Sequence, residues 1–205
     1  MTNPPLFFAG SFNPIHHGHL IIAQWTAEAI GADRVVILPS AQNPLKKGVT
    51  TQADAAKVGL ASCEDRLNMC RLAVASLPGF EVSDLELRRP GPSYTIDTIQ
   101  ALRLQNHQKI WWLMGADQLE YLPKWREIDK LLAEVRFVIA KRPGFEVDWG
   151  KLPAEFARLK DEVVRAPLLE ISATEIRRRV AASLPIDFMT PASVVRYIRE
   201  RGLYR

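Results

Sequence analysis

Cysteine is scarce in this chain, since Cys63 and Cys70 are the only two among 205 residues. They are seven positions apart in a segment with a helical pattern, which places both on one helix face. This spacing suits neither a disulfide framework nor a four-ligand zinc site, and it favours a reducing compartment. Long apolar runs are also missing, and residues 1–5 lack the basic region of a signal peptide. We therefore expect a cytoplasmic protein without a membrane span.

Neither sign of charge dominates. Lys and Arg number 27 against 23 Asp and Glu, the formal net charge is +4, and 47% of the residues are hydrophobic. This composition excludes a disordered or fibrous chain, and the length predicts one domain spanning residues 1–205. The small basic excess fits either an ordinary Arg-rich surface or a preference for anionic ligands such as nucleotides.

Short apolar runs alternate with helical patterns along the chain, which predicts βαβ units around a mostly parallel sheet. The expected fold is a single doubly wound, Rossmann-like α/β domain. Strands are predicted at 6–9, 34–38, 109–114 and 136–140, with one or two more within 80–87 and a last one at 163–164 or 168–169. Helices are predicted at 17–30, 64–76, 95–104, 127–134, 172–182 and 191–201. Residues 40–62 are predicted to form a long loop, and 145–162 a loop with a short helix.

The first strand-to-helix junction carries an unusual concentration of histidine. Three of the four histidines fall within 16–19, directly after the turn that follows Gly10. His16 and His19 are three apart, so they share a helical face at a helix N-terminus, where free N–H groups favour anions. Gly10 and Gly18 permit close approach of a ligand or backbone. A phosphate site is favoured over a metal site, because no Cys or carboxylate partners are nearby in sequence.

A second candidate phosphate site opens the helix predicted at 172–182. Ser172 and Thr174 place hydroxyls beside the free N–H groups of that helix start, and Ser172 with Glu175 fits a capping box. Arg177 follows one turn later, and its guanidinium can fork onto phosphate oxygens. Arg178 and Arg179 are interpreted as solvated surface residues.

Both segments resemble signatures of the nucleotidyltransferase superfamily of adenylyl- and cytidylyltransferases. Gly10-Ser11-Phe12-Asn13-Pro14-x-His16-x-Gly18-His19 is similar to its (H/T)xGH motif, and Ile171-Ser172-Ala173-Thr174-Glu175-Ile176-Arg177 to its ISxTxxR motif. The resemblance implies catalytic roles for His16, His19 and Arg177. It also implies nucleotide binding by Gly10, Ser11, Phe12, Gly18, Gly115, Asp117, Ile171, Ser172 and Thr174.

Further segments resemble the bacterial nicotinate-nucleotide adenylyltransferases nearly from end to end. They are Ser93-Tyr94-Thr95 with Thr98, Gly115-Ala116-Asp117-Gln118-Leu119, Pro123-Lys124-Trp125, Lys141-Arg142-Pro143-Gly144 and Gly202-Leu203-Tyr204-Arg205. The resemblance implies that Tyr94, Thr95 and Trp125 line a nicotinate pocket, with Lys46 and Arg142 as further substrate contacts. Core packing is an equal alternative for Tyr94 and Trp125, whereas for Lys46 solvent exposure is the favoured alternative. Asp117 is implied on the adenosine side and is also predicted to cap the next short helix.

The implied reaction transfers the adenylyl group of ATP to nicotinate mononucleotide, giving deamido-NAD and pyrophosphate. Mg²⁺ is expected to arrive with ATP and to be held by phosphates and water, so no protein metal site is expected. ATP and nicotinate mononucleotide are the expected partners, without nucleic acid or membrane, and the oligomeric state is left open.

Departures from the family pattern leave alternatives. Ala9 replaces a common glycine, Asn13 stands where Asp is frequent, and Leu45 replaces a histidine of a Pro-His-Lys segment. Nicotinamide mononucleotide or phosphopantetheine are alternative acceptors. A non-catalytic nucleotide- or RNA-binding domain is a further alternative, although no basic run with interleaved aromatics supports an RNA platform.

Overall fold

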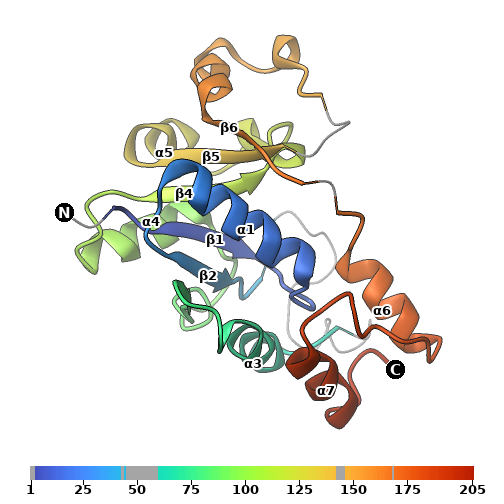
Figure 1. Ribbon diagram of the computed structural model, residues 1–205. Helices are drawn as coiled ribbons and strands as arrows, with labels where there is room; N and C mark the ends of the chain where they lie inside the picture. The colour runs from blue at the N-terminus through green and yellow to red at the C-terminus, as the bar shows by residue number, and fades with distance from the viewer. Residues whose placement is uncertain (1–2, 43, 45–59, 142–145, 168) are drawn as a thin grey trace. The chain divides into compact units, whose positions relative to one another are not determined.

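The computed structural model describes residues 3–42, 44, 60–141, 146–167 and 169–205. Within these ranges six strands form one sheet in the order β3-β2-β1-β4-β5-β6 (Figure 1). The pairs β1–β4, β4–β5 and β5–β6 are parallel. This topology confirms the predicted Rossmann-like α/β fold. The strands are β1 Leu6–Gly10, β2 Val35–Pro39, β3 Phe80–Val82, β4 Trp111–Gly115, β5 Arg136–Lys141 and β6 Val163–Arg165.

The helices follow the predicted pattern closely. The α-helices are α1 His17–Ile30, α3 Cys63–Val74, α4 Thr95–Leu104, α5 Ile128–Glu134, α6 Ala173–Ala181 and α7 Ala192–Glu200. Short 3₁₀ helices are η1 Ala116–Gln118, η2 Leu122–Lys124, η3 Trp149–Lys151 and η4 Ala154–Glu162. The bounds of α1 and α4 match the sequence prediction, because both segments have apolar residues at helical spacing and a glycine or polar stop.

Two compact units divide the chain, and each is built from three separate segments. Unit 1 comprises Met1–Phe8, Ile22–Val36 and Tyr94–Leu168, and unit 2 comprises Ala9–Ile21, Ile37–Ser93 and Leu169–Arg205. Trp112, Phe137 and Phe156 are fully buried in unit 1. In unit 2, α3 and α7 pack side by side, with Met69 and Ile198 buried (Figure 1). The expectation of a single domain stays a prediction.

The structure specifies several local predictions more closely. Residues 80–87 supply one strand, after which the Leu87 N–H donates to the Asp84 carbonyl at 2.9 Å and turns the chain. The helix predicted at 191–201 is α7, which begins one residue later, at Ala192, with Pro191 as its N-cap. The short helix expected within 145–162 is two 3₁₀ helices. The prediction of a last strand at 163–164 is confirmed by β6.

Candidate functional site

The loop between β1 and α1 is held in place by its carbonyl groups. The Gly10 carbonyl accepts from the Ser40 N–H at 2.9 Å, and the Ile15 carbonyl accepts from the Thr190 hydroxyl at 2.7 Å. The Ser11 carbonyl accepts from the Arg66 guanidinium at 2.8 Å. Each of these oxygens thus faces a donor from a distant segment of unit 2. Because carbonyl oxygens repel a phosphate, engaging these three in hydrogen bonds lowers the repulsion that an anion would meet at the loop.

His16 and His19 lie next to each other, as their spacing predicted, and their rings are stacked. Their ring centroids are 3.6 Å apart with an interplanar angle of 23°, and the Phe12 and His19 rings meet edge to face with their centroids 5.0 Å apart. The stack therefore brings the two imidazoles of the first motif side by side at the start of α1.

The proton of neutral His19 is placed by its hydrogen bond. The backbone N–H of His16 donates to Nδ1 of His19 at 3.3 Å. Because Nδ1 is the acceptor, the neutral ring carries its hydrogen on Nε2. His19 is partly exposed, whereas His16 is 4% exposed. Of the two rings, His19 therefore presents the more accessible N–H donor.

Gly18 packs closely against the same pair. A Cβ at this position would come within 3.0 Å of Nδ1 and 3.1 Å of Cε1 of the His16 ring. It would also lie 3.5 Å from the carbonyl oxygen of Ile171. The close approach predicted at Gly18 is therefore made by an imidazole from the first motif and a backbone group from the second.

The second motif joins the first through Arg177. Its guanidinium NH1 donates to the Asn13 carbonyl at 2.7 Å, and NH2 donates to the Thr174 hydroxyl at 3.3 Å. These residues all belong to unit 2, so the two predicted phosphate motifs are brought together there. Arg177 is only partly buried, and a guanidinium has five N–H donors in total. It therefore retains donors for a phosphate.

The start of α6 confirms half of the predicted capping box. The Glu175 N–H donates to the Ser172 hydroxyl at 3.1 Å. Both carboxylate oxygens of Glu175 instead accept from Arg178, at 2.7 Å each. Arg178 is exposed, as predicted. Its guanidinium pairs with Glu175 and takes no part in the contacts that Arg177 makes with Asn13 and Thr174.

Arg66 was missed by the sequence interpretation. It is 5% exposed, and its guanidinium donates to the Ser11 carbonyl at 2.8 Å, to the Ala41 carbonyl at 3.3 Å and to the Cys63 sulfur at 3.1 Å. No carboxylate of the described residues forms an ion pair with it. A charged residue on a helix is usually solvated, so only the fold reveals this buried cation beside the loop.

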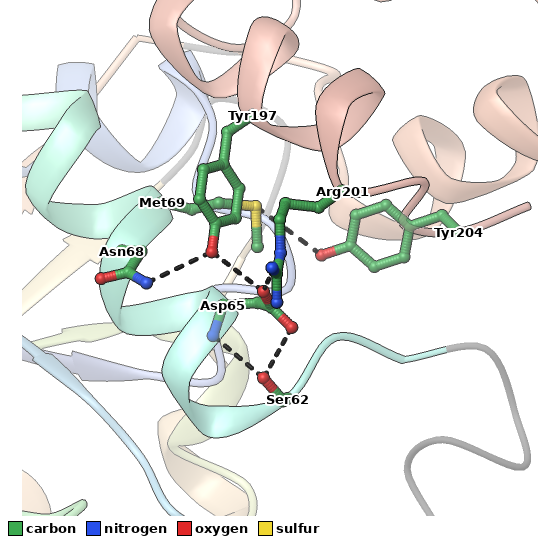
Figure 2. A network of polar contacts seen from close by, with 7 residues as sticks. All are labelled: Ser62, Asp65, Asn68, Met69, Tyr197, Arg201 and Tyr204. Atoms are coloured by element: carbon green, nitrogen blue, oxygen red, sulfur yellow. Dashed lines mark hydrogen bonds and ion pairs between the residues drawn. The ribbon is translucent and has the colours of Figure 1, made fainter.

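Asp65, the neighbour of Arg66, is the centre of a polar network between α3 and α7 (Figure 2). Its carboxylate accepts from the Ser62 hydroxyl at 2.6 Å and the Tyr197 hydroxyl at 2.9 Å, and it faces Arg201 at 3.4 Å. Burial alone would raise the pKa of Asp65, but the Ser62 and Tyr197 hydrogen bonds and the Arg201 charge lower it on balance. The network therefore ties α3 to α7 through an ionised carboxylate.

The predicted nicotinate residues lie in unit 1. Tyr94 is the N-cap of α4 and Thr95 is its first residue, where N–H groups lack helical partners. The Arg126 guanidinium lies 5.2 Å from the centroid of the Tyr94 ring and 4.0 Å from the Asp97 carboxylate. Trp125 contacts Phe137 edge to face at 6.2 Å, and its buried indole N–H has no hydrogen-bond partner within the described chain. Trp125 therefore combines core packing with an unused donor.

Asp117 does not cap the helix that it was predicted to cap. The N-cap of η1 is Gly115, and Asp117 lies inside the 3₁₀ turn. The chain enters this turn directly from β4, so the capping position falls two residues earlier. A Cβ at Gly115 would clash with the Asp117 carboxylate, which also accepts from Gln118 at 2.8 Å. Gly115 thus allows the carboxylate to fold back over the strand end.

A cavity of about 460 Å³ opens elsewhere in unit 1, at the amino ends of β4 and β5. Its wall includes Lys109, Arg136 and Arg158. Ligands of open α/β sheets bind at the opposite, carboxyl ends of strands, where Gly115 and Asp117 follow β4. The cavity is therefore not the predicted nucleotide site.

Comparison with known proteins agrees with the two motifs. The Cytidylyltransferase-like family model matches residues 7–179. A probable nicotinate-nucleotide adenylyltransferase of Roseiflexus sp. (strain RS-1) is 42% identical, with 100% of both chains covered. One from Herpetosiphon aurantiacus is 40% identical, with 95% of each chain covered. The chain belongs to the nicotinate-nucleotide adenylyltransferase family.

A solved structure supports the same fold. The Plasmodium falciparum nicotinic acid mononucleotide adenylyltransferase complexed with NaAD has a TM-score of 0.75 and 19% identity, covering 98% of this chain and 97% of its own. Membership of the nicotinate-nucleotide adenylyltransferase family makes this chain a nucleotidyltransferase of pyridine nucleotide biosynthesis. The predicted family and enzyme class are thereby confirmed.

Lys46, Leu45 and Arg142 lie outside the described residues. In the described part of the chain, no group of three or more His, Cys, Asp or Glu side chains is arranged to hold a metal ion. None of the helices described is long and apolar enough to cross a membrane.

Proposed function

We propose that the chain transfers the adenylyl group of ATP to nicotinate mononucleotide, forming deamido-NAD (NaAD) and pyrophosphate. The observation that carries this proposal is the junction of the two phosphate motifs, where Arg177 donates to the Asn13 carbonyl at 2.7 Å. The names of the relatives and the nearly complete coverage of their lengths support the choice of acceptor.

The reaction needs no protein nucleophile. An oxygen of the acceptor's 5′-phosphate attacks the α-phosphorus of ATP, a new P–O bond forms, and the bond to the β-phosphate oxygen breaks. The bonding electrons leave with pyrophosphate. Catalysis then consists of positioning and of stabilising charge on the phosphoryl oxygens.

Each motif residue has a part in this scheme. His19 offers Nε2–H to an α-phosphoryl oxygen, and His16 supports its orientation through the ring stack. Arg177 and the free N–H groups at the start of α6 bind the β- and γ-phosphates and the leaving pyrophosphate. Mg²⁺ arrives with ATP and neutralises charge on its phosphates.

Residues of unit 1 are assigned to the acceptor ring. A nicotinate ring in the mononucleotide is a flat pyridinium cation with a carboxylate. Aromatic faces such as those of Tyr94 and Trp125 attract such a cation. The N–H groups at the start of α4, beside Thr95, are suited to the ring carboxylate, because a helix N-terminus favours an anion. A neutral amide at the same place would gain less, which favours the acid.

The test is pyrophosphate release by the purified chain with ATP and Mg²⁺, comparing nicotinate mononucleotide with nicotinamide mononucleotide. We expect strong release with the acid and weak release with the amide. Preference for the amide would contradict the assignment of the ring carboxylate. No release with either acceptor, from folded protein, would contradict the proposed function, and phosphopantetheine would be the next acceptor to assay.

A further inference from the structure

Tyr204 reaches the phosphate loop from a segment that follows α7. Its ring is 7% exposed, and its hydroxyl donates to Oδ1 of Asn13 at 2.6 Å. The same oxygen accepts from the backbone N–H of Ala61 at 3.3 Å. The Tyr204 hydroxyl also lies 4.0 Å from the Met69 sulfur (Figure 2). All four residues belong to unit 2, and Asn13 is 8% exposed.

The direction of this hydrogen bond is fixed by its chemistry. An amide oxygen only accepts, so the phenol must be the donor. Burial raises the pKa of Tyr204 above its usual value, outweighing the opposing effect of Arg177 and Arg66. The phenol therefore stays protonated, and the Asn13 side chain keeps its donor throughout the working pH range.

Asn13 passes this restraint to the phosphate-binding groups. Its own backbone carbonyl accepts the 2.7 Å bond from Arg177. His16 follows three residues later, in the loop between β1 and α1. A chain of contacts thus runs from the Tyr204 hydroxyl through Asn13 to the guanidinium assigned to pyrophosphate. Tyr204 itself is not assigned to any substrate contact.

We propose that Tyr204 is a positioning residue for adenylyl transfer, because its hydroxyl sets Asn13 and, through it, Arg177. This inference rests on the proposed function and names a group that the two motifs do not contain. A buried hydrogen bond contributes a net factor of about 3 to 10 in an equilibrium or a rate. The effect of losing it falls on the geometry of the phosphates and not on the nicotinate ring.

The matched variants are Tyr204→Phe and Tyr197→Phe. Each removes one phenolic hydroxyl from the same part of unit 2, and Tyr197 contacts Asp65 and Asn68 on α3 but not the phosphate loop. For Tyr204→Phe we expect kcat/KM for ATP to fall about threefold to tenfold, with KM for nicotinate mononucleotide unchanged. For Tyr197→Phe we expect lower urea stability and nearly unchanged kinetics. Equal kinetic losses in the two variants would overturn the proposal, as would normal kinetics of Tyr204→Phe.

A double-mutant cycle tests the route through Asn13. If Tyr204 acts through Asn13, then Tyr204→Phe added to Asn13→Ala lowers kcat/KM no further than Asn13→Ala alone. Fully additive losses would contradict that route. If Asn13→Ala does not fold, Asn13→Asp replaces it, since a carboxylate keeps an acceptor for the phenol. In that background Tyr204→Phe should still cost activity, and no cost would overturn the proposal.

ATP binding separates this proposal from the proposed function. Calorimetric titration of the wild type, Tyr204→Phe and Tyr197→Phe with ATP needs no acceptor. Wild-type protein that binds ATP but never releases pyrophosphate would refute the proposed function alone. Tyr204→Phe should bind ATP at least about threefold more weakly, whereas Tyr197→Phe should match the wild type. Equal affinity of all three proteins would refute the positioning role.

Discussion

Replacement of His19 tests the assignment of the catalytic donor most directly. The structure gives Nδ1 an internal donor, the His16 N–H at 3.3 Å, so the neutral ring carries its hydrogen on Nε2, the atom assigned to the α-phosphoryl oxygen. Loss of one donor to transition-state charge costs about a hundredfold or more in kcat, or about 2.7 kcal/mol. We therefore expect His19→Ala to fold and to lower kcat for pyrophosphate release by at least that factor, with saturating ATP and nicotinate mononucleotide.

Two amide variants sharpen the test, because Gln places an N–H group near the position of Nε2 and Asn places one near Nδ1. His19→Gln should therefore retain more activity than His19→Asn. His17→Ala is the matched control, since His17 shares the helix start and its backbone bond to the Met189 carbonyl at 3.0 Å survives the change. Near-normal turnover of His19→Ala would refute the catalytic role of His19. Higher turnover of His19→Asn than of His19→Gln would refute the assignment of the ring hydrogen to Nε2.

Other changes have expected outcomes. Arg177→Lys keeps the charge but loses the guanidinium fork, so kcat/KM for ATP should fall at least about tenfold in steady-state assays. Gly18→Ala places a methyl 3.0 Å from the His16 ring. It should lower kcat clearly, with only a small change in the melting temperature. Trp125→Ala should raise KM for nicotinate mononucleotide more than KM for ATP. The pKa of Asp65 is lower in the folded chain than in the unfolded chain, where it is about 3.9. The ionised carboxylate therefore stabilises the fold fully at pH values above about 3.9, and this stabilisation is lost as the pH falls through the lower pKa of the folded chain. Asp65→Asn should therefore lower the urea midpoint at pH 7, and the difference in urea midpoint between the wild type and this variant should be smaller at pH 3.

The sequence predicted the helices, the strands and both motifs because these features depend on residues that are close together in the chain. The helix start at 17 follows a strand and a turn, and the Ser172 hydroxyl accepts from the Glu175 N–H within the first turn of its own helix. The three-residue spacing of His16 and His19 was enough to predict a shared face, which the stack confirms. Asp117 shows the limit of such reasoning. A short polar residue after a strand is typical of a cap, but the chain turned two residues earlier.

The contacts that were missed join residues far apart in the sequence. Arg66, Thr190 and Arg177 each donate to a backbone carbonyl of the loop between β1 and α1. Every residue has a backbone carbonyl, so the sequence does not indicate which carbonyls act as acceptors. The donors resemble ordinary helix or loop residues. Tyr204 was noted only as part of a family ending, and its partner Asn13 only as a departure from Asp. The hydrogen bond between Tyr204 and Asn13 becomes visible only in the folded structure.

These missed contacts have one physical effect in common. A loop that binds phosphate must turn its N–H groups inward, and each carbonyl that points outward then needs a donor. In this chain the donors come from α3, from α6 and from the segment before α7. Arg177 is also assigned to the ATP phosphates, whereas Arg66 and Thr190 hold the phosphate loop without an assigned contact to ATP. Substitutions at such positions should change the use of ATP more than their distance from the histidines in the sequence suggests.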